Sequence, residues 1–290
     1  MSPESVPNHW QSVRDHSRVF GRFTYVYPVV SRRSRGLSIG VNLNPDKACN
    51  FDCVYCEVDR KTPPATRELD LLKARAELCA LVDGARAGEL EKDPKFAEAG
   101  SLTRHVRDIA FSGDGEPTLV GNFAECVRMV AEVRRSRRLD DAKIVLITDA
   151  AGLDKASVKE GLALMDANNG EVWAKLDAGT EPYYRAINRT AVSFQRVLAN
   201  LAATARERPI VIQTLFLKMH GEVMPPAELD AYCDRLRDIT AAGGRIKEVH
   251  AYTIARPTPE SWVTRLEPAE LEHLAAHVRT RTGLVVSCFP

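Results

Sequence analysis

Three cysteines within eight residues constrain this chain more than any other feature. Cys49, Cys53 and Cys56 form a C-x3-C-x2-C run directly after an apolar stretch. A cubane iron–sulfur cluster has four irons, and each of them normally takes one cysteine thiolate. Three thiolates leave one iron without a protein ligand, and such an open position distinguishes a reactive metal site from a structural one.

Zinc is the alternative metal that these cysteines could bind. Structural zinc sites are closed and tetrahedral, so zinc needs a fourth cysteine or histidine at a usable spacing. His9 and His16 lie far upstream, and no CxxC or CxxH run follows the three cysteines. The ligand count therefore favours the iron–sulfur interpretation, with zinc as the alternative.

The overall composition is that of an ordinary globular protein. Hydrophobic residues make up 44% of the 290 residues, which is enough for one large domain or two smaller ones. Lys and Arg total 40 against 39 Asp and Glu, so the net charge is +1. This balance gives no general attraction to nucleic acid, although a local basic groove can exist within it.

The cysteine count and the N-terminus bear on the location of the protein. Seven cysteines, an odd number with three of them bunched, do not resemble a disulfide framework. The first seven residues lack the charged and apolar regions of a signal peptide. No stretch approaches the roughly 18 apolar residues of a membrane span. We therefore expect a cytoplasmic protein that does not enter a membrane.

Apolar runs alternate with helical patterns from Leu37 onwards. The runs are mostly continuous rather than alternating, which is typical of parallel strands covered on both faces. The expected strands are Leu37–Leu43, Asp108–Ser112, Lys143–Thr148, Glu171–Leu176, Ile210–Leu217 and Glu248–Thr253. The expected helices are Glu68–Leu81, Phe123–Arg135, Lys155–Met165, Ser193–Ala205, Pro226–Ile239 and Pro268–Thr280.

This alternation predicts repeated right-handed βα units and an α/β fold. Six units form a partial (β/α)6 TIM-like barrel over residues 37–256. Residues 1–36 are expected to form an N-terminal cap, and residues 257–290 a helix–strand extension ending in Leu284–Cys288. The polar stretch Gly84–Arg107 is long for a connection, so it is expected to be a lid or an exposed excursion.

In βα barrels the loops that leave the C-terminal ends of the strands build the active site. The cysteine run follows the first strand. The second strand leads into Ser112-Gly113-Asp114-Gly115-Glu116-Pro117, where glycines permit close approach of a ligand to the backbone. The Glu116 carboxylate is placed to accept a hydrogen bond from a ligand ammonium group. An ordinary glycine-rich turn is the alternative.

Polar residues also follow the later strands. Lys175 and Asp177 interrupt an apolar run, which favours either a ligand contact or a salt bridge, because unpaired charges are almost never buried. Gln213, Tyr252 and Arg256 are expected to face the mouth of the barrel and to contact the substrate. Arg256 offers the forked donor geometry that suits a carboxylate or phosphate. Satisfied structural polarity is the alternative for all three.

The cysteine run, with the aromatic Tyr55 before its third cysteine, resembles the signature loop of the radical S-adenosylmethionine (SAM) enzymes. That resemblance implies a [4Fe–4S] cluster held by Cys49, Cys53 and Cys56. It also implies that SAM chelates the fourth iron, and that one electron cleaves SAM to a 5′-deoxyadenosyl radical.

Further SAM contacts are implied by the same resemblance. Gly113, Gly115 and Glu116 resemble the glycine-rich GGE(P) motif that binds the SAM amino group, with Asp114 in place of its first glycine. Polar residues at the next two strand ends contact the SAM ribose and carboxylate in the family. By that resemblance Thr148, Lys175 and Asp177 are candidates.

Within this superfamily, residues 27–256 are similar to small proteins grouped with the tRNA wyosine synthases. Those synthases bind a second cluster through cysteines upstream of the radical SAM loop. Residues 1–48 of this chain contain no cysteine. This difference weighs against the tRNA reaction, which stays an alternative.

The expected function is therefore that of a radical SAM enzyme that abstracts hydrogen from an unidentified substrate. A flavodoxin- or ferredoxin-type protein is the expected electron donor. The substrate is either a small anionic molecule held by Arg256 or a tRNA or protein, and the balanced charge favours the former. An iron–sulfur electron carrier without SAM chemistry is the alternative from another class.

Overall fold

The computed structural model describes residues 20–64 and 66–290 of the chain. Eight strands form one sheet in the order β1-β2-β3-β4-β5-β6-β8-β10, and β7 and β9 form a separate antiparallel pair. Helices follow most of the parallel strands. This strand order with alternating helices confirms the α/β class and the predicted partial (β/α)6 barrel topology.

The chain divides into two compact units. The first contains residues up to Ala48 with Asp59–Ile147 and Lys155–Glu171, and the second contains Cys49–Val58, Thr148–Asp154 and Val172–Pro290. The cysteine loop and most of the predicted site residues therefore belong to the second unit, and the glycine-rich loop belongs to the first.

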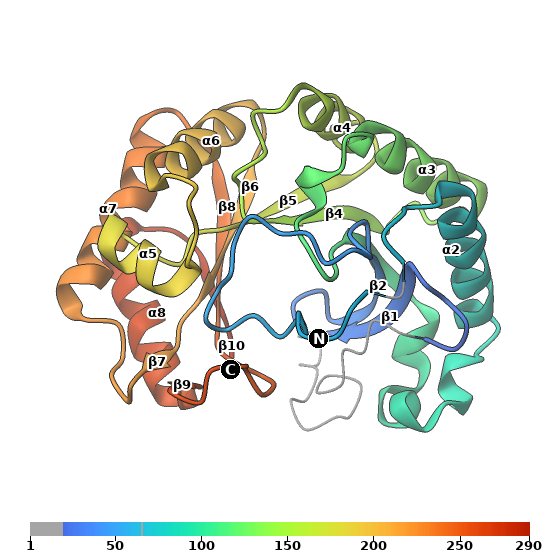
Figure 1. Cartoon of the computed structure of the whole chain (residues 1–290), viewed down its shortest axis with the longest axis horizontal. Coiled ribbons are helices and arrows are strands. Elements are labelled where there is room, and N and C mark those ends of the chain that lie inside the picture. Colours follow the sequence, from blue (N-terminus) through green and yellow to red (C-terminus); the bar gives the residue numbers. More distant parts are fainter. Residues whose placement is uncertain (1–19, 65) are drawn as a thin grey trace. The chain divides into compact units, whose positions relative to one another are not determined.

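In the first unit, β1 pairs antiparallel with β2, and β2, β3 and β4 are parallel. Helices α2, α3 and α4 follow one another along one side of these strands (Figure 1). The bounds are β1 Val26–Ser31, β2 Gly36–Val41, α2 Leu71–Arg86, β3 Val106–Phe111, α3 Phe123–Ser136, β4 Lys143–Thr148 and α4 Ala156–Asp166.

Strand β1 was not expected from the sequence, which assigned residues 1–36 to a cap. Residues 26–31 instead add an antiparallel strand at the edge of the sheet. The buried Glu77 of α2 holds the chain just before β1, because its carboxylate accepts the backbone N–H groups of Thr24 and Tyr25 at 2.9 and 2.7 Å. Residues 1–19 of the expected cap lie outside the described residues.

The stretch 84–107 is neither a lid nor an exposed excursion. It completes α2 and continues through two 3-10 helices, η1 (Leu90–Lys92) and η2 (Pro94–Arg104). Phe96 is fully buried, and Arg104 Nε lies 2.6 Å from a Glu91 carboxylate oxygen. The apolar residues scattered through this polar segment pack it onto the first unit.

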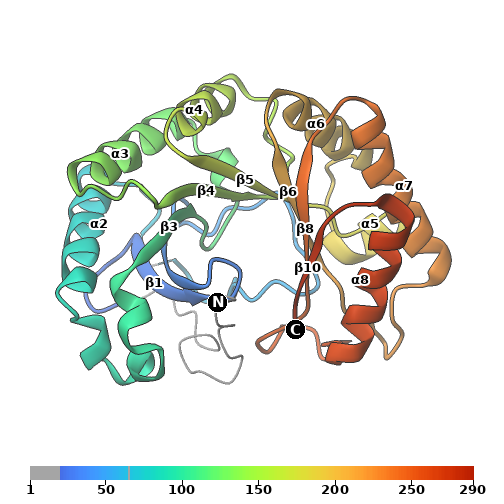
Figure 2. The same cartoon turned by 180° about the vertical axis from the view of Figure 1, so that it is seen from behind.

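In the second unit, β5, β6, β8 and β10 are parallel. Helices α6, α7 and α8 lie along one side of β6, β8 and β10 (Figure 2). The bounds are β5 Gly170–Lys175, α5 Glu181–Asn188, α6 Phe194–Glu207, β6 Ile210–Leu215, β7 Lys218–Met219, α7 Pro226–Ala241, β8 Ile246–Tyr252, β9 Val263–Thr264, α8 Pro268–Thr282 and β10 Val286–Phe289.

The predicted strands and helices match the observed ones to within a few residues, and the expected terminal strand is β10. Helix α5 and the β7–β9 pair were not expected. Among the described residues, no helix combines the length and the apolar character needed to cross a membrane.

Candidate functional site

The cysteine loop is attached to the end of α5. The backbone N–H groups of Asp52 and Val54 donate to the carbonyls of Asn188 and Ile187, at 3.1 and 2.9 Å. Just beyond the helix, Thr190 Oγ1 donates to the Asn50 carbonyl at 2.7 Å. These bonds fix the loop conformation between its first and third cysteines.

Asp177, two residues beyond β5, links the loop to the sheet. Its Oδ2 accepts hydrogen bonds from the Tyr55 hydroxyl and, at 3.2 Å, from Asn188 Nδ2. Its Oδ1 accepts the Leu215 backbone N–H at 2.9 Å. Asp177 is 2% exposed, so these donors replace the water that its carboxylate loses on burial. Asp177 therefore joins the cysteine loop, α5 and β6.

Asn188 contacts the middle cysteine directly. Its Nδ2 lies 3.3 Å from Cys53 Sγ and 3.2 Å from Asp177 Oδ2, so each of its two N–H bonds has an acceptor. Burial raises the pKa of the Cys53 thiol to about 11, while Lys175 and the Asn188 hydrogen bond act in the opposite direction. Bound iron would supply the positive charge that a thiolate at Cys53 needs.

Lys175 brings two predicted site residues together. Its Nζ lies 3.2 Å from the Tyr55 hydroxyl and 3.3 Å from the Tyr252 hydroxyl. Burial alone lowers the pKa of Lys175, but Tyr252 and the Asp177 carboxylate outweigh it, and the net pKa is raised. Lys175 therefore keeps a positive charge, which suits the binding of a carboxylate.

In the first unit, the glycine-rich loop lies against the segment that leads to Cys49. The Glu116 backbone N–H donates to the Ala48 carbonyl at 3.0 Å. A Cβ atom on Gly115 would lie 1.9 Å from that carbonyl oxygen, so only glycine fits there. Asp114 stands in place of the first glycine of the GGE pattern. Its Oδ2 accepts a hydrogen bond from Asn42 Nδ2 at 2.7 Å.

Glu116 is buried and caps the short helix η3 (Pro117–Leu119). Its Oε1 accepts from the backbone N–H and the hydroxyl of Thr118, at 3.0 and 2.7 Å. A carboxylate has further acceptor capacity beyond these two bonds. This geometry is compatible with the predicted contact to an ammonium group.

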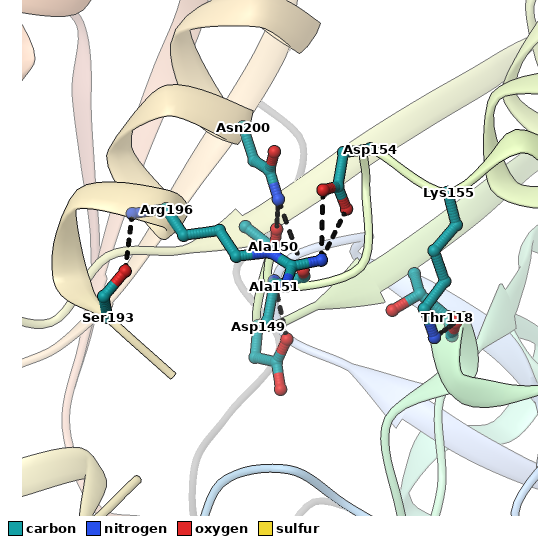
Figure 3. A network of polar contacts seen from close by, with 9 residues as sticks. All are labelled: Thr118, Asp149, Ala150, Ala151, Asp154, Lys155, Ser193, Arg196 and Asn200. Atoms are coloured by element: carbon teal, nitrogen blue, oxygen red, sulfur yellow. Dashed lines mark hydrogen bonds and ion pairs between the residues drawn. The ribbon is translucent and has the colours of Figure 1, made fainter. Parts of the chain in front are cut away.

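Thr148 ends β4 and begins a tightly bonded segment, of which Figure 3 shows Asp149, Ala150 and Ala151. Its hydroxyl accepts the Ala150 N–H at 3.0 Å, and Asp149 Oδ1 accepts the Ala151 N–H at 2.9 Å. Asn200 of α6 donates to the carbonyls of Ala150 and Ala151. These bonds fix the position of Thr148 in the second unit.

The three predicted substrate residues lie in different surroundings. The Tyr252 hydroxyl lies within hydrogen-bond distance of Lys175 Nζ. Arg256 pairs with Glu57, just after the third cysteine, with Nη2 and Oε2 2.5 Å apart. Gln213 is fully buried within β6. Sequence reasoning missed Asn188 and Glu57, which the fold brings to residues far away in the chain.

A further polar cluster lies on β8. His250 Nε2 and a Glu248 carboxylate oxygen are 3.1 Å apart, and the Ser287 hydroxyl donates to the other oxygen at 3.0 Å. The His250 ring meets Trp173 and Phe289 edge-on. The hydrogen bond from His250 is the main reason that the pKa of Glu248 is lowered to about 2, against the opposing effect of burial.

The donor set fits an iron–sulfur cluster. None of the seven cysteines forms a disulfide. Within residues 20–64 and 66–290, no three Cys, His, Asp or Glu side chains converge as a single metal ion would require. In a cubane each cysteine binds a different iron, so the three thiols need not converge on one point. The Asn188 N–H at Cys53 Sγ is the kind of contact that tunes such clusters.

Comparison with curated proteins finds partial matches, and no family model matches the chain. The chain is 26% identical over 270 residues to "GTPase Obg" of Brachyspira hyodysenteriae, covering 91% of the chain and 34% of that protein. It is 31% identical over 162 residues to a UPF0026 protein of Methanocaldococcus jannaschii, covering 56% of the chain and 43% of the relative. A UPF0026 protein of Helicobacter pylori is 25% identical over 170 residues, covering 56% of the chain and 47% of the relative. The chain thus spans between a third and a half of the length of these relatives.

Among solved structures, the chain is similar to TYW1 with a lysine–pyruvate adduct bound. The TM-score is 0.50 at 17% sequence identity, over 86% of this chain and 74% of the other. Archaeal TYW1 matches with a TM-score of 0.47 at 13% identity, over 84% of this chain and 72% of the other. At 17% identity, the similarity to TYW1 with the lysine–pyruvate adduct establishes the fold alone.

Glu248→Gln is expected to destabilise the protein at pH 7 by roughly 1–3 kcal/mol, because the ionised carboxylate accepts two hydrogen bonds. The pKa of Glu248 is about 2 in the folded state, against an ordinary 4.5. Its contribution is therefore complete above about pH 5 and lost as the pH falls toward 2. Denaturant unfolding at several pH values should show the difference between variant and wild type shrinking over that window. Glu272→Gln, at an exposed pair with Arg279, should cost less than about 1 kcal/mol; a cost equal to that of Glu248→Gln would contradict the account.

Proposed function

We propose that the protein is a radical SAM enzyme with one [4Fe–4S] cluster on Cys49, Cys53 and Cys56. The observation that carries this proposal is the buried network that joins Cys53, through Asn188 and Asp177, to Tyr55 and Lys175. The fold similarity to TYW1 and the partial match to the UPF0026 proteins support it. When bound, the reduced cluster and SAM together supply a carbon-centred radical that abstracts hydrogen.

The residues of the chain have distinct proposed roles. In the second unit the charged Lys175 binds the SAM carboxylate, with Tyr55 and Tyr252 orienting its ammonium group, and Thr148 contacts the ribose. Asp177 positions Tyr55 and Asn188, because its Oδ2 accepts a hydrogen bond from each of them. In the first unit Gly115 and Glu116 bind the SAM amino group.

The reaction itself is proposed at the level of hydrogen abstraction from a small substrate. Wyosine-type tRNA modification is the second candidate, favoured by the similarity to TYW1. Residues 1–48 contain no cysteine that could bind a second cluster, which supports the first candidate. A flavodoxin- or ferredoxin-type donor and a reducing, cytoplasmic location complete the proposal, because the cluster must be reduced.

We do not propose a GTPase activity for this chain, although the Brachyspira relative is named a GTPase. The sequence contains no G-x4-G-K-[ST] run, the loop with which P-loop GTPases bind phosphates. The alignment spans only 34% of that relative, so the chain matches a part of it.

Anaerobic reconstitution is expected to give a protein with about four irons that cleaves SAM to 5′-deoxyadenosine and methionine when reduced. Cys53→Ala should lose both the iron and the cleavage, whereas Cys79→Ala in α2 should keep both. Iron analysis and chromatography of the products check this. Full iron and full cleavage in Cys53→Ala would refute the ligand assignment.

Glu116→Gln is expected to weaken SAM binding by at least about tenfold while cluster content stays normal, because the amide lacks the negative charge that attracts the amino group. Glutamine can still accept the Thr118 hydrogen bonds, so this variant separates ligand binding from helix capping. Calorimetry with SAM on the reconstituted protein gives the affinity. Equal affinities in the variant and the wild type would remove Glu116 from the site.

Asn188→Ala is expected to make the midpoint potential of the cluster more negative. A hydrogen bond to a ligating sulfur stabilises the more negative reduced state, and the alanine variant lacks it. A redox titration followed by electron paramagnetic resonance gives the potential. Asn200→Ala is the matched control, because that buried amide donates to backbone carbonyls. Both variants having the wild-type potential would show that Asn188 does not tune the cluster.

A further inference from the structure

Gln213 is a polar side chain buried without a partner. It is 0% exposed, and neither its Oε1 nor its Nε2 makes a hydrogen bond within the described part of the chain. Its neighbours Val211 and Ile212 on β6 are apolar and equally buried. A buried amide with both polar atoms unpaired costs free energy that an apolar residue would avoid. This cost indicates a ligand that pairs with the amide.

The sheet register places Gln213 on the face that meets the cysteine loop. Gln213 lies beside Lys175 of β5 and beside His250 of β8. Lys175 reaches Tyr55 of the cysteine loop, and residues side by side in parallel strands share a face. Thr214, the next residue, lies on the opposite face, where its hydroxyl and that of Tyr232 in α7 are 2.5 Å apart.

Polar residues also occupy the positions in register with Gln213 on the neighbouring strands. Lys175, Gln213, His250 and Ser287 occupy matching positions on β5, β6, β8 and β10, and we call them the polar row. Glu248 fixes His250 and Ser287, as described above. Parallel strands buried on both faces are normally apolar, so four polar residues in register are unusual. Gln213 occupies an inner position of the row.

We propose that Gln213, which lies between Lys175 and His250 in the polar row, recognises a planar amide group on the substrate. A glutamine amide offers one carbonyl acceptor and N–H donors side by side. A carboxamide, lactam or ureido group presents the same pair in reverse, so two hydrogen bonds form at once. A carboxylate has only acceptors and would leave Gln213 Oε1 facing another oxygen. That the bound molecule is a substrate rests on the proposed function. The presence of an amide-binding site at Gln213 does not.

The first test is stability. Gln213→Leu is expected to raise the melting temperature of the ligand-free, reconstituted protein, because the variant removes unpaired buried polar atoms. Thr214→Val is the matched control on the same strand, and it is expected to lower the melting temperature by removing the bond to Tyr232. A lower melting temperature in Gln213→Leu would show that the amide has a structural partner, and would overturn the proposal.

The second test is binding, with acetamide and nicotinamide as probes and acetate and nicotinate as matched compounds without the amide N–H. Calorimetry should show that at least one amide binds the wild type at least about tenfold more tightly than its acid, and that Gln213→Leu loses this binding. No amide binding to the wild type, equal binding of amide and acid, or equal binding to the variant would each overturn the proposal. Neither test requires SAM cleavage, so failure of the proposed function would show separately, as a reconstituted wild type that does not cleave SAM.

Discussion

The hydrogen bonds of the Asp177 carboxylate are the interaction on which the second unit depends. One buried charge accepts from Tyr55, Asn188 and the Leu215 backbone, and so ties together a loop, a helix and a strand that are distant in sequence. A buried carboxylate persists only where donors replace water, so each of these donors is held in place as well. The Cys53 thiol and the Lys175 ammonium group take their positions from the same network.

In the first unit, a close contact between two backbone segments holds the site residues in place. Gly115 has no side chain, so the carbonyl of Ala48, next to the first cysteine, can lie against the glycine-rich loop. The Glu116 N–H bonds to that carbonyl, and Asn42 binds Asp114. The first unit thus uses a tight backbone contact, and the second unit a buried charge, to fix residues that follow its strands.

The sequence predicts the fold well because short apolar, β-branched runs such as Lys143–Thr148 alternate with longer helical patterns, which is typical of buried parallel strands. It also predicts the cysteine loop, Lys175, Asp177 and Glu116 as residues placed at strand ends. It does not predict β1 or the eight-residue α5, whose short polar sequence carries a weak helical pattern. Nor does it predict Asn188 at Cys53 or Glu57 at Arg256. These pairs are 135 and 199 residues apart, and only the folded chain shows that they meet.

The proposed function requires that the three cysteines leave one iron of the cluster open for SAM. Electron–nuclear double resonance on the reduced, reconstituted protein with SAM labelled by ¹⁷O in its carboxylate and ¹⁵N in its amino group tests this most directly. The account predicts strong couplings from both labels, because both groups would bind one iron. A cluster that is reduced in the presence of excess labelled SAM and shows neither coupling would contradict it.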